Sequence, residues 1–170
     1  MSESTINNSS SAKELLQLVI CQLSNEEYGV QISSVKEIIR IPDITKIPHV
    51  PDYVEGIINL RNKIIPVINL ATKFNLSNEG LNDQSRIVIV EIGNIVAGMV
   101  VDAVTEVLRV SAEDIERAPD MITSNISEKY IDGVGKLDDR LLILLDIDQI
   151  FTEEQKVQIH HLENAGSIPA

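Results

Sequence analysis

Two runs of β-branched residues around a short polar break form the clearest hydrophobic pattern of this chain, between Val54 and Leu70. The polar break is the triplet Arg-Asn-Lys at 61–63. This arrangement predicts a β-hairpin, because asparagine tolerates the positive φ that a tight hairpin turn needs. Pro66 cannot donate to a ladder, so its nitrogen should face away from a paired neighbour. Asn69 is placed to cap a short helix over 70–74.

The same pattern occurs a second time, and residues 131–151 align on 54–74 without a gap. A matching pair of blocks lies upstream at 29–41 and 98–110, where Val, Glu and Arg recur at equal spacing. The offset between copies is 69 residues for the upstream blocks and 77 for the hairpins, so the second copy contains a longer connection. An internal repeat of this size indicates two similar subdomains stacked against each other.

Other short apolar runs complete each copy. One helical turn is expected at 33–35, since two serines compete with strand pairing there, and Ser111 offers a cap for a second turn. The runs that predict strands lie at 15–23, 28–32, 36–41, 86–92, 95–101 and 104–110. Many short strands with tight turns are typical of small closed barrels. We therefore expect an all-β protein, with one barrel over 15–80 and a second over 81–151, sharing apolar surface because each alone is small.

Composition limits the function. The 170 residues carry a formal net charge of −12, which argues against nucleic acid or anionic lipid as partners. The single Cys21 excludes an internal disulfide and fits a reducing compartment. Residues 1–14 are polar and predict a disordered tail, and 152–170 form a C-terminal extension. No apolar run reaches the roughly 18 residues of a membrane span. We expect a soluble cytoplasmic protein.

Motifs for chemistry are missing from the sequence. It has no phosphate-binding loop, dinucleotide fingerprint or zinc spacing, so neither a cofactor nor a metal is expected. The pair His160-His161 is better explained as a solvated tail, and Cys21 as a buried small hydrophobe. The acidic residues of the second hairpin, including Asp138 and Asp146, are explained by turn and cap chemistry. The protein is therefore predicted not to be an enzyme.

Two roles are possible for three charged residues. Arg61 lies at the tip of the first predicted hairpin, while Glu37 and Arg40 lie on an otherwise apolar strand. They could form a solvated turn and a surface ion pair of little energetic value. They could also mark a binding surface on an adaptor. An alternative for the whole protein is a small-ligand-binding barrel, which would need an apolar cavity.

The motif Gly-Ile-Ile-Asn-Leu-Arg, followed by Ile-Pro-Val-Ile-Asn-Leu and preceded by Tyr-Gly-Val and Val-Lys-Glu-Ile, resembles the bacterial chemotaxis coupling family, CheW. The resemblance covers about 15–151. It implies two five-stranded SH3-like barrels around a shared apolar core and no catalytic activity. Asn62 stands where the family usually has glycine, and Asn69 where it usually has aspartate; both can fill the same backbone roles.

The resemblance also implies partners and contact residues. Members of the family bridge the cytoplasmic tips of methyl-accepting chemoreceptors to the regulatory domain of the histidine kinase CheA. A receptor tip would lie in a groove between the barrels, and the protein would be recruited to membrane-associated receptor arrays without inserting into the membrane. The expected receptor contacts are Val35, Glu37, Arg61, Ile87 and Val100. The kinase-binding residues are not indicated.

Overall fold

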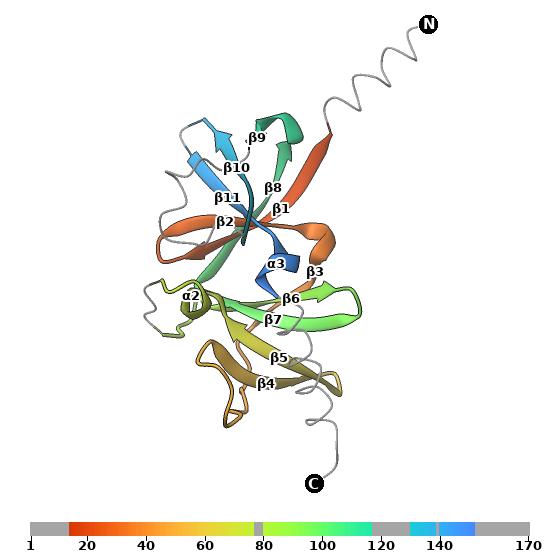
Figure 1. Cartoon of the computed structure of the whole chain (residues 1–170), viewed down its shortest axis with the longest axis vertical. Coiled ribbons are helices and arrows are strands. Elements are labelled where there is room, and N and C mark those ends of the chain that lie inside the picture. The colour runs from red at the N-terminus through yellow and green to blue at the C-terminus, as the bar shows by residue number, and fades with distance from the viewer. Residues whose placement is uncertain (1–13, 77–79, 117–129, 139, 152–170) are drawn as a thin grey trace, which may run out of the picture.

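The structure is a computed structural model that describes residues 14–76, 80–116, 130–138 and 140–151 (Figure 1). Of the predicted tails at 1–14 and 152–170, all residues but Glu14 lie outside the described residues. The strands are β1 (Leu15–Leu23), β2 (Glu26–Gln31), β3 (Val35–Arg40), β4 (Val54–Leu60), β5 (Lys63–Asn69), β6 (Arg86–Ile92), β7 (Ile95–Val101), β8 (Ala103–Ser111), β9 (Ile115–Glu116), β10 (Ile131–Leu137) and β11 (Arg140–Leu145). The prediction of an all-β protein is confirmed.

Helix is limited to short pieces within the described ranges. They are α2 (Leu70–Lys73), α3 (Ile147–Ile150) and the 3-10 turns η1 (Ile32–Ser34) and η2 (Ala112–Asp114). As predicted, Asn69 caps α2, its side-chain oxygen accepting from the N–H of Thr72 at 3.1 Å. In the described part of the chain, no helix is long and apolar enough to cross a membrane.

The strands form two sheets, which lie one above the other in Figure 1. The first barrel is the five-stranded sheet β3-β6-β7-β5-β4. The second barrel is the six-stranded sheet β8-β1-β2-β11-β10-β9, in which β9 contributes only two residues. Each barrel therefore combines strands from both copies of the sequence repeat.

This pairing corrects the predicted boundary near residue 80. The hairpin β1–β2 of the first copy pairs with strands of the second copy and not with those of its own. Its strand β1 is antiparallel to β8, and its strand β2 is parallel to β11. The hairpin β6–β7 of the second copy pairs in the same way with β3 and β5 of the first. The two copies thus exchange their first hairpins, so the first barrel consists of β3 to β7 and the second of β1, β2 and β8 to β11.

Burial explains why these hairpins lie where they do. In β1 the residues Leu18 to Cys21 are all buried, and in β6 the residues Ile87 to Val90 are all buried. A strand with both faces buried must lie between two apolar layers. One face of each hairpin lines the core of its barrel, and the other faces the core between the barrels.

The core between the barrels joins both sheets. It contains Val19 and Tyr28 from the second barrel and Val88 and Met99 from the first, and these four side chains are essentially inaccessible to solvent. Phe74 also belongs to this shared core. The prediction that the two halves share apolar surface is confirmed.

Candidate functional site

The β4–β5 turn holds Arg61 and Asn62 in the left-handed region, with φ values of 51° and 68°. Positive φ at both central residues suits the twist of a hairpin and favours Asn, Asp or Gly. The positive φ predicted at Asn62 is confirmed, but the sequence did not predict it for Arg61. An arginine in this conformation carries about 1–2 kcal/mol of strain. The β1–β2 turn has the same pair of conformations at Ser24 and Asn25, so the strain follows from the hairpin turn and does not by itself assign a function to Arg61.

The guanidinium of Arg61 donates to the carboxylate of Glu37 on β3, which ties the hairpin turn to the edge of the first barrel. Glu37 lies opposite Ile89, a residue of the first-barrel core, and directly opposed residues share a face of the sheet. The ion pair therefore lies at the end of that core. The Arg61 side chain is 70% exposed and that of Glu37 30%, so most of the arginine side chain is accessible to a partner.

The three predicted apolar contacts differ in accessibility. Val35 follows η1 and is half-buried against the shared core. Ile87 and Val100 face each other across the β6–β7 ladder inside the first-barrel core, with exposed fractions of 0% and 3%. In this structure they offer no side-chain surface to a partner. Their role in receptor binding stays a prediction.

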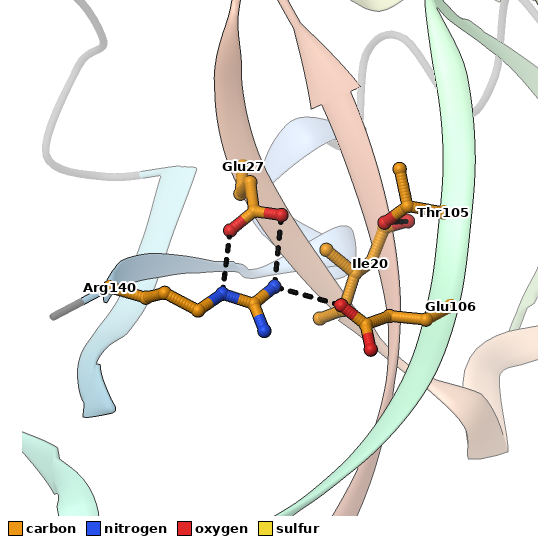
Figure 2. Close-up of polar contacts among 5 residues, drawn as sticks. All are labelled: Ile20, Glu27, Thr105, Glu106 and Arg140. Carbon is orange, nitrogen blue, oxygen red and sulfur yellow. Dashed lines mark hydrogen bonds and ion pairs between the residues drawn. The ribbon is translucent and has the colours of Figure 1, made fainter. Parts of the chain in front are cut away.

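The second barrel contains a related cluster, shown in Figure 2. Glu106 is the repeat counterpart of Glu37, and it accepts from Nη2 of Arg140 at 3.0 Å. Arg140 also donates from Nε and Nη2 to the two oxygens of Glu27, at 3.0 and 2.9 Å. The hydrogen bonds to Glu27, and to a smaller extent the one to Glu106, raise the pKa of the Arg140 guanidinium. This arginine is engaged by two carboxylates, whereas Arg61 is engaged by one.

Sequence reasoning missed this cluster because its arginine lies at a different position of the hairpin. Arg140 aligns on Lys63, and the residue that aligns on Arg61 is Asp138. The only available signal was a basic residue at 63 and 140 in both copies. Glu106 therefore shares its arginine with a second carboxylate, whereas Glu37 forms a single ion pair with Arg61.

Other candidates for chemistry have structural explanations. Cys21 is buried, and burial raises the pKa of its thiol to about 12, so it is unreactive. Asp146 caps α3 by accepting from the N–H of Gln149 at 3.3 Å, as predicted. Within the described residues no group of three or more His, Cys, Asp or Glu side chains could hold a metal. His160-His161 lies outside them.

Two surface hollows bear on the small-ligand alternative. Their volumes are about 310 and 650 Å³. The smaller is lined by Gln31, Ser34, Glu91, Ile92, Gly93, Asp132, Leu145, Asp146, Ile147 and Asp148. The larger is lined by Gln22, Ser24, Asn25, Gly80, Asn82, Gln84, Asp102, Ala103, Val104 and Thr105. Both linings are mainly polar, unlike the apolar cavity that the alternative needs.

Comparison with known proteins places this geometry in a family. A family model described as a CheW-like domain matches residues 17–155. A chemotaxis protein CheW of Treponema pallidum is 39% identical over 88% of this chain and 89% of its own length. Its counterpart in Klebsiella aerogenes is 34% identical over 86% and 87%.

A solved structure gives the same answer for the fold. The scaffolding protein TtCheW from Thermoanaerobacter tengcongensis superimposes with a TM-score of 0.75 at 39% identity, over 82% of this chain and 90% of that one. The chain therefore belongs to the CheW-like family of chemotaxis scaffold proteins, which are adaptors and not enzymes.

Proposed function

We propose that this protein couples methyl-accepting chemoreceptors to the histidine kinase CheA and so controls kinase activity. It would act in the cytoplasm, recruited to membrane-associated receptor arrays. Membership of a scaffold family supports an adaptor role. The observation that carries the proposal is the exposed Arg61 tied to Glu37 at the end of the first barrel.

The proposed receptor contacts are Val35, Glu37 and Arg61. Glu37 and Arg61 are joined by their ion pair, and Val35 precedes Glu37 by two residues at the start of β3. Ile87 and Val100 would hold this surface from the first-barrel core. An arginine offers a planar fork of donors to carboxylate or carbonyl groups of a receptor helix. The kinase regulatory domain would dock at a separate barrel end.

Two titrations test the proposal. The full chain is titrated with a receptor cytoplasmic tip fragment and, separately, with the CheA regulatory domain. We expect both to bind, and Glu37→Lys and Arg61→Ala to weaken receptor binding while kinase binding is retained. Failure of the wild-type chain to bind either partner would refute the coupling function. Binding of both partners with unchanged receptor affinity in the variants would refute the contact residues only.

A further inference from the structure

Charge is divided unequally between the two barrels. Over 35–76 and 80–101, the first barrel with its loops has seven basic and six acidic residues. Over the remaining described residues, the second barrel with its flanking turns has three basic and twelve acidic residues. Of the ten basic residues in the described ranges, seven therefore lie on the barrel that carries Arg61.

The outer face of β3 concentrates these cations around an apolar side chain. Side chains alternate along a strand, and Lys36, Ile38 and Arg40 are the exposed residues of β3. Ile38 is 37% exposed and lies opposite Val88, so it extends the margin of the shared core to solvent. An apolar centre surrounded by charged residues is the usual arrangement of a protein–protein interface.

Across the ladder, Arg40 lies directly opposite Arg86 of β6. Like charges at directly opposed positions are destabilising. The guanidinium of Arg86 is held in place by the carbonyl oxygens of Asp83 and Ser85, both at 2.8 Å, and these neutral acceptors leave its charge uncompensated. Lys36 has a carboxylate nearby, Glu91 at 3.9 Å. A carboxylate brought by a partner would relieve the Arg40–Arg86 repulsion.

The corresponding face of β8 lacks this arrangement. Val107, the counterpart of Ile38, is 50% exposed, so an apolar centre is present there as well. Thr105 replaces Lys36, and Arg109, the counterpart of Arg40, lies opposite the neutral Gln17. The repeat therefore provides a matched surface that has the apolar centre without the paired cations.

We propose that the outer face of β3, together with Arg86 of β6, docks an acidic segment of the receptor tip, with an apolar residue on Ile38 and carboxylates beside Arg40. This inference rests on the proposed coupling function and adds the chemistry of the receptor surface. Glu37 faces the other side of the sheet, so the docked segment would be separated from Glu37 and Arg61 by the edge strand β3 itself. The cationic face would also accelerate association with an acidic partner, since complementary charges steer encounter.

The test measures association of the receptor tip fragment with the full chain at several salt concentrations. Arg40→Glu should weaken binding about tenfold, mainly by slowing association, and should reduce its salt dependence. The fold should not suffer, because the substitution removes the repulsion with Arg86. Ile38→Ser should weaken binding without changing the salt dependence. The matched controls Arg109→Glu and Val107→Ser should leave binding within about twofold of wild type.

Wild-type binding to the receptor with unchanged affinity in Arg40→Glu and Ile38→Ser would overturn this inference and leave the proposed function standing. Equal losses in the β8 controls would also overturn it, because the effect would then follow net charge rather than this face. Loss of kinase binding instead of receptor binding would assign the surface to the kinase. Absence of receptor binding by the wild-type chain would refute the coupling function, and this inference with it.

Discussion

Replacing Arg61 by asparagine separates binding from stability, because the two depend on different properties of this residue. The backbone of Arg61 is left-handed, with φ of 51°, and asparagine tolerates that conformation much better. Relief of this strain should stabilise the fold by about 1–2 kcal/mol. Loss of the exposed ion pair with Glu37 should cost about 0–1 kcal/mol. The free energy of unfolding should therefore stay the same or rise by up to about 2 kcal/mol.

Receptor binding should change in the opposite direction. If the exposed guanidinium is a main contact, its loss should cost about 1–3 kcal/mol, or roughly 5–150-fold in affinity. Urea unfolding gives the stability, and calorimetric titration with a receptor tip fragment gives the affinity. Asp138→Asn is the matched control, since Asp138 has a φ of 49° at the same position of the second hairpin. It should leave receptor affinity unchanged.

Two results would refute this reasoning. If Arg61→Asn lowered the free energy of unfolding by more than about 1 kcal/mol, the ion pair with Glu37 would be worth more than an exposed pair usually is. If receptor affinity stayed at the wild-type value while stability rose, Arg61 would be a tolerated turn residue and not a contact.

Three further outcomes are expected. Gly56→Ala should destabilise the fold by more than about 3 kcal/mol in urea unfolding, because φ is +146° and the added Cβ would lie 2.1 Å from the carbonyl oxygen of Thr45; a small effect would contradict this close approach. Arg140→Ala should lower the melting temperature more than Arg61→Ala, since it leaves two carboxylates without their shared cation. Partial burial, and secondly the charge of Asp146, raise the pKa of Asp132, so the folded state binds its proton more tightly than the unfolded state. Its ionised form therefore costs stability above the folded-state pKa, and the cost decreases as the pH falls below that pKa and is gone below the pKa of the unfolded state. The melting temperature of Asp132→Asn minus that of wild type should therefore be larger at pH 7 than at pH 4. An equal difference at the two pH values would contradict this.

The sequence by itself determined the local elements and the duplication. Both hairpins, the cap at Asn69 and the positive φ at Asn62 follow from turn and cap chemistry, which acts over a few residues. The family follows from a motif at fixed spacing, and the same motif indicates Glu37 and Arg61 as binding residues. These features could be predicted because each depends on neighbours in the chain.

Only the tertiary structure decided which copy each hairpin joins. Both copies present the same apolar pattern, so sequence alone cannot distinguish pairing within a copy from exchange between copies. The long-range ladders of β1 with β8 and of β6 with β3 settle the question, and they bury both faces of the exchanged strands. The burial of Ile87, the cluster around Arg140 and the opposition of Arg40 and Arg86 all follow from these pairings. They join residues distant in sequence, and packing around the shared core brings them together.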